Sequence, residues 1–513
     1  MSARLVGAID QGTTGTRFML FDHDGRVKAS AYREHRQITP RPGWVEHDPM
    51  EIWANTQQVI RSALLRGRVD GANLVAIGVT NQRETTIVWD RNSGRPYGNA
   101  IVWQDLRTRD LCARLQRQGL EATVRRSTGL RIATYFSGPK LRWMLDAWPG
   151  LRAAARRGDA LFGTVDSWLI WWLTGGPSSG AHVTDATNAS RTMLMDLRRL
   201  EWSDELLGAL KIPARMLPAI RPSSSRIPYG MTSAAGPLRA SVPVCGDLGD
   251  QQAALFGQAC FKAGEAKNTY GTGSFLLLNT GTRPVSSRHG LLTTVAYSLD
   301  AGRRAYALEG SIAVTGAVVQ WLRDNLHLIA AASETERVAG AVEDSGGLVF
   351  VPAFSGLFAP YWDMDARGAI LGLTRYATRE HLVRAALESI CYQSREVADA
   401  MRKDARIRLR RLKVDGGAVR NDLLMQMQAD ILGVPVVRPR VDEATALGAA
   451  YAAGLAVGFW RSLEELSRHQ RIDRVFRPRW DRRRREAGLR LWQRGVARVE
   501  KWLDPNERVA PPG

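Results

Sequence analysis

The sequence predicts an α/β protein made of two related halves, and three observations support this. Residues 5–21 contain an apolar strand, a turn rich in Gly and Thr, and a second apolar strand. Residues 266–278 repeat this pattern in the middle of the chain, and a short Gly-containing turn between two apolar strands is typical of a hairpin. After each hairpin, strands alternate with amphipathic helices, which is the pattern of α/β folds.

The first half continues with a strand at 26–32 and a helix that begins near Asp48. Asp48 supplies an N-cap, Pro49 suits the first helical position, and the apolar residues that follow recur at helical spacing. The remaining elements of this half are expected as strands at 74–80 and 86–89 and helices at 106–118, 138–147 and 166–173.

The second half repeats the mixture of strands and helices, and the seam between the halves is expected near residues 250–260. We therefore divide the chain into residues 1–255 and 256–513, which suits a length of 513 residues. The elements of the second half are expected as strands at 305–309 and 411–415 and helices at 315–327, at 379–402 and from about Asn421, after a turn at Gly416 and Gly417.

The composition indicates a globular protein of the cytoplasm. Hydrophobic residues make up 44% and charged residues 24% of the chain, which excludes a disordered chain and a small disulfide scaffold. The N-terminus has no basic segment followed by a long apolar one, so no secretory signal is expected. The four cysteines form no CxxC pair, and reduced thiols are the simplest interpretation.

The net charge of +20 is the unusual property of the chain. Only eight of the 71 basic residues are lysine, and arginines cluster at 406–411 and 482–485. These clusters could bind a polyanion, or they could be solvated faces near the C-terminus. We favour the second interpretation and expect no nucleic-acid partner, because no zinc finger or aromatic-rich RNA motif accompanies them.

An uncharged stretch at 444–460 is the one candidate for a membrane span. Its length is at the lower limit of the roughly 17–25 residues that a span needs, and it is rich in Ala and Gly rather than Leu and Ile. We favour a buried helix packed closely on a sheet, with no stable insertion into a membrane.

The Gly/Thr turns are candidate phosphate sites, although the chain has no P-loop motif. Backbone N–H groups in such turns can point at anions, and Thr13, Thr14 and Thr272 add hydroxyl donors. Arg17 adds a positive charge, and the Asp10 carboxylate could hold Mg²⁺ directly or through water. One turn in each half suggests a nucleotide clamped between them, although each turn alone could be a simple hairpin.

Two carboxylates lie near the seam, Asp247 and Asp250. Either could be a catalytic base, or, because glycines flank them, either could be a turn residue.

Eight short blocks between about residues 5 and 460 resemble, in order, the glycerol kinase group of the FGGY carbohydrate kinases, within the actin-like ATPase superfamily. The blocks are D10QGTTGTR17, T80NQRETTIVW89, I101VWQD105, Y135FSGPKLRW143, G249DQQAALFG257, N268TYGTGSF275, S355GLFAPYWDMDARGAILGLT374 and D415GGAVRN421.

This resemblance implies a fold, a reaction and partners. The fold would be two RNase-H-like lobes around a deep cleft, with the polyol near the first lobe and ATP against the second. The reaction would move the γ-phosphate of ATP to a primary hydroxyl of glycerol, giving sn-glycerol 3-phosphate and ADP, with Mg²⁺ as cofactor. Members of the family are often dimers or tetramers, so a homo-oligomer is implied.

The resemblance also implies roles for single residues. Asp250 would be the general base and Asp10 the magnesium-associated carboxylate, while Asp247 is expected to be a turn residue. At Gly15 many members have Ser, so no phosphate contact is assigned there. The glycerol contacts would be Arg83, Glu84, Trp103, Tyr135, Asp250, Gln251 and Phe275. The nucleotide contacts would be Thr13, Thr14, Arg17, Thr272, Gly316, Gln320, Gly417 and Asn421.

Other interpretations stay open. Trp103 and Phe275 could be core side chains, and Gly316 could be a helix-packing glycine. The enzyme could act on a pentulose or another polyol, although the Arg83–Glu84 pair and Trp103 favour glycerol. The basic charge also allows a binding protein, for nucleic acid or a membrane, with a degenerate kinase site.

Overall fold

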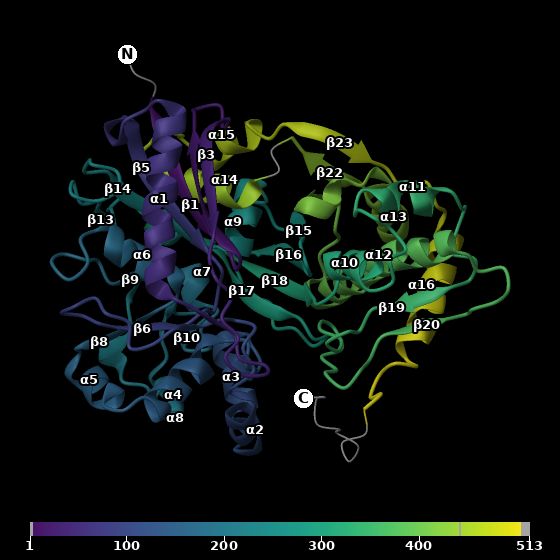
Figure 1. The fold of residues 1–513 in the computed structure, drawn as a ribbon, viewed down its shortest axis with the longest axis horizontal. Coiled ribbons are helices and arrows are strands. Elements are labelled where there is room, and N and C mark those ends of the chain that lie inside the picture. The colour runs from purple at the N-terminus through teal and green to yellow at the C-terminus, as the bar shows by residue number, and fades with distance from the viewer. Residues whose placement is uncertain (1–3, 441–442, 504–513) are drawn as a thin grey trace.

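A computed structural model describes residues 4–440 and 443–503. The chain forms two lobes that lie side by side, each with helices packed around a central sheet (Figure 1). The predicted α/β fold with two lobes is therefore confirmed. None of the described helices is long and apolar enough to cross a membrane.

The sheet of the first lobe has six strands in the order β13-β14-β5-β1-β2-β3. The predicted first hairpin is β1 and β2, which pair antiparallel, and β3 continues the meander. Strands β5 and β14 join β1 in parallel. The bounds are β1 Leu5–Gln11, β2 Gly15–Phe21, β3 Val27–Glu34, β5 Leu74–Asn81, β13 Gly230–Met231 and β14 Pro243–Gly249.

The sheet of the second lobe repeats this plan in seven strands, in the order β17-β18-β16-β15-β21-β22-β23. The second predicted hairpin, β15 and β16, is antiparallel, and β21 and β22 continue from β15 in parallel. This shared plan confirms the predicted internal repeat. The bounds are β15 Ala266–Tyr270, β16 Ser274–Gly281, β17 Leu292–Ser298, β18 Arg304–Ile312, β21 Leu412–Asp415, β22 Val436–Pro439 and β23 Ile472–Phe476.

The predicted helices are all present, with ends that differ by a few residues. Helix α1 begins at Pro49, and the Asp48 side chain caps it by accepting from the Met50 N–H. In the first half the helices are α1 Pro49–Gly67, α2 Arg109–Arg117, α3 Glu121–Thr128, α4 Ser137–Ala147, α5 Leu151–Arg157, α6 Val165–Leu173, α7 Ala186–Ala189, α8 Asp204–Leu210 and α9 Asp250–Gly257. Those of the second half are α10 Gly316–Asp324, α11 Glu334–Gly340, α12 Arg379–Ala405, α13 Asp422–Leu432, α14 Ala444–Ala456, α15 Leu463–Arg468 and α16 Arg482–Val496.

Short strand pairs complete the molecule outside the two main sheets. They are β4 Glu46–His47 with β7 Ala100–Ile101, β6 Ile87–Asp90 with β8 Ala160–Gly163, β9 Val183–Asp185 with β12 Ala219–Arg221, β10 Met195–Asp196 with β11 Glu201–Trp202, and β19 Val349–Val351 with β20 Ala369–Leu371.

Helix α14 is the uncharged stretch of the sequence, and it is a buried helix as expected. It lies against β1, β5 and β14 of the first lobe and crosses α9, although it belongs to the second half of the sequence (Figure 1). Glycines make this close approach possible: a Cβ at Gly78 would overlap the Ala449 carbonyl oxygen, and one at Gly448 would overlap the Ala253 carbonyl oxygen. The seam between the lobes is therefore the α9–α14 crossing.

Candidate active site

The first Gly/Thr turn places Asp10 beside Arg17, which are paired across β1 and β2. The Gly12 N–H donates to the Gly15 carbonyl oxygen at 2.9 Å and closes the turn. A Cβ at position 15 would lie 2.6 Å from the Tyr32 hydroxyl oxygen. The Arg33 carbonyl oxygen, at 2.5 Å, is as close as the Tyr32 side chain, so this chain has no room for the serine that many family members have at this position.

Trp103 reaches this turn from the loop after β7. Its indole Nε1–H donates to the Thr13 hydroxyl at 2.9 Å, and its ring meets the Tyr135 ring edge to face, with centroids 5.6 Å apart. Trp103 is only half-buried, and the alternative of a core side chain is therefore not supported. The aromatic pair instead forms a wall beside the turn.

Several charged groups act on the Asp10 carboxylate at the end of β1. Burial raises the pKa of Asp10 to about 7, Arg17 lowers it, and Glu443 and Asp250 raise it further. Arg17 in turn contacts the Glu443 carboxylate. A carboxylate oxygen is a ligand that a hard divalent cation such as Mg²⁺ prefers. Asp10 therefore fits the metal, whereas Glu443 is paired with Arg17 and Asp250 with Arg83.

Arg83 lies at the centre of the site and joins the two lobes. Its guanidinium donates to both carboxylate oxygens of Glu309, at 2.6 and 3.1 Å, and its Nε lies 3.1 Å from the Asp250 carboxylate. It is buried, and the Phe275 ring lies 5.8 Å away. Because Arg83 follows β5 in the first lobe while Glu309 is on β18 in the second, the ion pair crosses between them.

Glu84 is held on the other side of this cluster by Arg191. The Arg191 Nε donates to one Glu84 oxygen at 2.6 Å, and its Nη2 donates to Glu309 at 2.9 Å. The Glu84 backbone has a φ of 62°, a left-handed conformation that turns the chain sharply after β5. Burial alone would raise the pKa of Glu309, but Arg191 and Arg83 lower it to about 2.

Helix α9 begins at Asp250, and the next residue is tied to the second lobe. The Lys267 ammonium on β15 donates to the Gln251 side-chain oxygen at 2.5 Å and to the Thr269 hydroxyl at 2.7 Å. Burial lowers the pKa of Lys267 to about 8, while the carboxylates of Asp415 and Asp250 act in the opposite direction. A positive charge therefore lies close to the start of α9.

The expectation that Asp247 is a turn residue is wrong. Asp247 lies inside β14 and is fully buried. Burial and the neighbouring Asp166 and Asp185 raise its pKa well above the ordinary value, which favours the protonated acid. The preceding glycine, Gly246, marks the close approach of α14, since a Cβ there would meet backbone atoms of Ala453.

The second Gly/Thr turn meets the start of α10. The Gly316 N–H donates to the Gly271 carbonyl oxygen at 2.9 Å, and the Thr315 N–H donates to the Thr272 carbonyl oxygen at 2.9 Å. A Cβ at Gly316 would lie 2.6 Å from that same Gly271 oxygen. The glycine is thus needed where α10 meets the turn, and Gln320 lies exposed one turn further along α10.

Gly417 and Asn421 lie after β21, in the next loop of the second lobe. A Cβ at Gly417 would meet no atom within 4 Å, so the space beside it is open. The Asn421 side chain is already engaged, because its oxygen accepts from the Leu424 N–H at 2.8 Å and its amide donates to Thr335 at 3.1 Å. Asn421 is thus an N-cap of α13 in this structure.

The structure brings some of the predicted site residues into contact and leaves others apart. Arg83, Glu84, Asp250 and Phe275 belong to one cluster of contacts, and Trp103 and Tyr135 lie at its edge through the Arg191 guanidinium, 5.6 Å from the Tyr135 ring. Thr272 and Gly316 form a separate group on the second lobe. Among the described residues, no hydrogen bond or ion pair joins the two Gly/Thr turns. Their joint role in binding a nucleotide therefore stays a prediction.

Arg191, Glu309 and Lys267 belong to the site but were missed from the sequence. Two of them could have been noticed: Lys267 is the single charge of β15, and Glu309 is the single charge of β18 after its first residue, Arg304. A charge on a buried strand must be paired, and its partner must then lie nearby. Arg191 lies in a polar segment around α7 and gave no such signal.

Comparison with known proteins places this arrangement among kinases. The family model for the N-terminal domain of the FGGY family of carbohydrate kinases matches residues 5–257. The family model for the C-terminal domain of the same family matches residues 266–457. The chain is 59% identical to the glycerol kinase of Chloroflexus aurantiacus, over 98% of this chain and 100% of that protein. It is also 59% identical to glycerol kinase 1 of Streptomyces coelicolor, over 98% and 99%.

Solved structures agree with this comparison. The crystal structure of Plasmodium falciparum glycerol kinase with ADP has a TM-score of 0.91 and 38% identity, covering 97% of this chain and 98% of that chain. A ligand-bound xylulose kinase from Lactobacillus acidophilus has a TM-score of 0.85 at 23% identity, over 96% and 97%, and at this identity it supports the fold alone.

Proposed function

Because the chain belongs to the FGGY family of carbohydrate kinases, we propose that it transfers the γ-phosphate of ATP to a primary hydroxyl of glycerol, giving sn-glycerol 3-phosphate and ADP. Relatives named glycerol kinase, similar over nearly their whole length, support this substrate. The observation in the structure that carries the proposal is the Arg83 guanidinium, which touches the Asp250 carboxylate and lies next to Glu84.

Glycerol is small and carries three hydroxyls, and the site offers matching groups. Arg83 donates hydrogen bonds, and the Glu84 oxygen not held by Arg191 can accept one. Tyr135 and Gln251 complete the polar contacts, while Trp103 and Phe275 cover the carbon edge of the substrate. A site that hydrogen-bonds each hydroxyl rejects analogues that lack one by large factors.

Asp250 is the general base of this proposal. Its carboxylate accepts the proton of the attacking hydroxyl, and Arg83 fixes the carboxylate from the side at 3.1 Å. The transition state of phosphoryl transfer is loose, so positioning and neutralisation of charge contribute more than proton removal. Lys267 is available to neutralise charge near the start of α9.

The nucleotide lies between the two Gly/Thr turns in this proposal. Thr13, Thr14 and Arg17 contact the phosphates from the first lobe, and Thr272 contacts them from the second. The nucleotide pocket is completed by Gly316, Gln320, Gly417 and Asn421. Mg²⁺ would be held by Asp10, directly or through water, and would supply charge neutralisation of the phosphates.

The setting of the reaction is also part of the proposal. We assign residues 1–255 to polyol binding and the first phosphate turn, and residues 256–513 to nucleotide binding. A reducing cytoplasm suits the four cysteines, which are all buried and free. A homo-oligomer, either a dimer or a tetramer, is proposed from family resemblance.

The first test is a coupled ADP-release assay with MgATP, with and without glycerol. We expect strong glycerol-dependent turnover, with glycerol 3-phosphate as product. Asp250→Asn removes the proton acceptor and should lower kcat by about 10²–10⁴-fold, while ATP still binds. Near-normal turnover of this variant would overturn the assignment of the base.

A substrate panel separates glycerol from a pentulose or another polyol. A sugar with a higher kcat/KM than glycerol would replace the proposed substrate. Arg83→Lys keeps a positive charge beside Glu309 but loses the planar guanidinium with its several hydrogen-bond donors. It should therefore raise the KM for glycerol by about tenfold or more and leave the KM for ATP unchanged. An unchanged glycerol KM would contradict the role of Arg83.

A further inference from the structure

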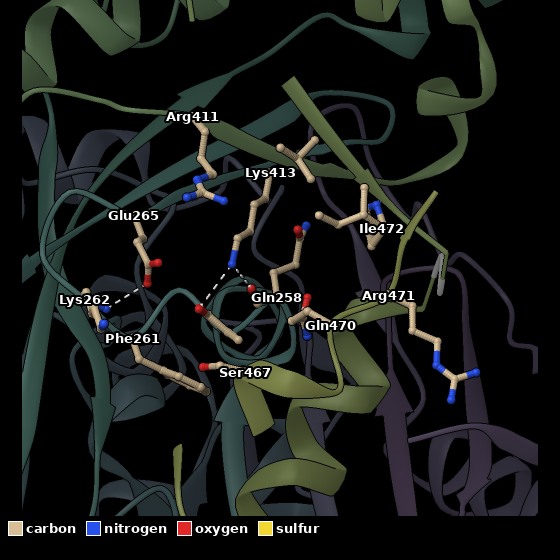
Figure 2. Close-up of a pocket in the computed structure, with 13 residues that line it drawn as sticks. Gln258, Phe261, Lys262, Glu265, Arg411, Lys413, Ser467, Gln470, Arg471 and Ile472 are labelled. Carbon is tan, nitrogen blue, oxygen red and sulfur yellow. Dashed lines mark hydrogen bonds between the residues drawn. The ribbon is translucent and has the colours of Figure 1, made fainter. Parts of the chain in front are cut away.

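A cavity of about 300 Å³ lies outside the site described above, at the opposite end of α9. Figure 2 shows it between the loop after α9, the strands β21 and β22, and the segment that joins α15 to β23. Its volume is at the lower end of the range for small-molecule pockets. The chemistry of its lining indicates what it binds.

Positive charge dominates the lining. Lys262, Arg411, Lys413 and Arg471 line the cavity, against a single carboxylate, Glu265. That carboxylate already accepts from the Lys262 backbone N–H at 2.9 Å. Within residues 4–440 and 443–503, none of these four basic side chains has a carboxylate as ion-pair partner. The cavity therefore has the charge to hold an anion.

Gln258 adds a second and independent observation. Its side chain lines the cavity and is almost fully buried, at 1% exposure, yet neither its amide nitrogen nor its amide oxygen has a hydrogen-bond partner among the described residues. A buried amide without partners is rare, because leaving a polar group unsatisfied is unfavourable. An amide that both donates and accepts suits a ligand with hydroxyl or phosphate oxygens.

The cavity is connected to the catalytic end of α9. The Lys413 ammonium donates to the Gln258 and Ala259 carbonyl oxygens at the C-terminal end of the helix, at 2.5 and 3.2 Å. Lys413 on β21 is paired in register with Lys267 on β15, which holds Gln251 at the N-terminal end. Neighbouring strands thus hold both ends of the helix that carries Asp250.

We propose that this cavity binds a small organic phosphate, a phosphomonoester of about three or four carbons. Arg411, Lys413 and Lys262 take the phosphate group, while the Arg471 guanidinium points away from them (Figure 2). The Gln258 amide takes a hydroxyl, and Phe261 and Val437 cover the carbon chain. An organic phosphate is preferred to inorganic phosphate, because only the former engages the amide and the apolar wall together. Binding here is separate from the proposed reaction and does not depend on it.

Calorimetric titration of the whole protein tests the proposal, with glycerol and MgADP present to fill the active site. The probes are glycerol 2-phosphate, inorganic phosphate and the neutral polyol erythritol. We expect saturable binding of glycerol 2-phosphate, weaker binding of inorganic phosphate, and none of erythritol. Absence of glycerol 2-phosphate binding would overturn the proposal, and equal affinity for inorganic phosphate would overturn the choice of an organic ligand.

Two exposed arginines give a matched pair of variants. Arg411→Gln removes a cation that lines the cavity and should weaken binding by about tenfold or more. Arg410→Gln makes the same change of charge one residue away, outside the cavity, and should leave the affinity within about twofold, as expected for an exposed charge. Lys262→Gln repeats the first result from another loop. Equal effects of both arginine variants would show general attraction to the basic surface and would overturn the site.

Discussion

A single carboxylate, Glu309, holds two guanidinium groups in the centre of the molecule. It accepts from Arg83 and from Arg191, and all three side chains are buried. Arg83, and Glu84 through Arg191, thus owe their orientation to a residue of the other lobe. A buried charge in such a network cannot be removed without leaving its partners uncompensated.

Glu309→Gln should lower the free energy of unfolding by about 3–5 kcal/mol, because two buried arginines lose their shared partner. The arginines lower the pKa of Glu309 from 4.5 to about 2, so its contribution to stability is present above about pH 4.5 and is lost as the pH falls toward 2. Urea denaturation at several pH values measures both effects. A variant as stable as the parent at neutral pH would contradict the network.

Lys267 should set the alkaline limit of activity. The pKa of Lys267 in the folded protein is about 8, so the ammonium loses its proton above that pH. The positive charge beside the start of α9 is then lost. In a pH profile of kcat we expect a decline above about pH 8, shifted to higher pH in Lys267→Arg, whose guanidinium stays protonated. Lys28→Arg, an exposed lysine on β3, is the control and should not move the profile.

The roles of single residues could be predicted where the residues belong to a recognisable motif. They could not be predicted where a role depends on tertiary contacts. Arg83 and Asp250 were found through short sequence blocks, and the structure brings their side chains into contact. Asp247 was misjudged because its flanking glycines suggested a turn, whereas Gly246 allows α14 to approach the strand and Gly249 leaves room for the Arg83 side chain. Arg191 is distant in sequence from Glu84, and only the fold brings them together.

At the scale of elements, the crossing of α9 and α14 is the feature on which the seam depends. Gly448 and Gly257 let the two backbones touch, since a Cβ on either would overlap carbonyl oxygens of the other helix. The two helices therefore need glycine at both contact points, and α9 begins with Asp250 beside this crossing.

Gly448→Ala should destabilise the protein by about 1–3 kcal/mol or more, because the added Cβ overlaps a backbone oxygen rather than a flexible side chain. The matched control is Gly208→Ala in α8, where a Cβ meets no atom within 4 Å. That change should stabilise by about 0.5–1 kcal/mol through helix propensity. Thermal unfolding of both variants measures the difference, and equal midpoints would refute the tight crossing.

The positions of elements could be predicted from the sequence better than their ends. Hydrophobic spacing located the hairpins and the long helices, and the Asp48–Pro49 cap located the start of α1. Helix α10 was expected to extend to residue 327 but ends at Asp324, and His327 has a φ of 53°, which an α-helix does not allow. Such ends depend on loop packing, which local sequence does not report.

For the whole molecule, the lobes are interlaced rather than merely adjacent. The first lobe completes its core with α14, and the Arg83–Glu309 ion pair joins the lobes at the site. The sequence predicted two related halves in order along the chain. It did not predict that α14 packs on the sheet of the first lobe, because an Ala- and Gly-rich stretch does not indicate which sheet it covers.

The interlaced lobes should unfold together. Proteins with independent domains unfold in separate steps, but the first lobe here has no complete core without α14, which comes from the other half of the chain. We expect one calorimetric transition in which the measured and van't Hoff enthalpies agree, and coincident loss of far-UV dichroism and tryptophan fluorescence. Two resolved transitions would show that the first lobe is stable without α14.

The position of α14 in the sequence also matters while the protein is being made. At 5–20 residues per second, the stretch between Gly257 and Ala444 takes roughly 10–40 s to leave the ribosome. Throughout that time the nascent first sheet has strands but lacks the helix that covers β1, β5 and β14. An apolar face is therefore exposed on the growing chain until α14 has been made, and exposed apolar surface of this kind favours aggregation.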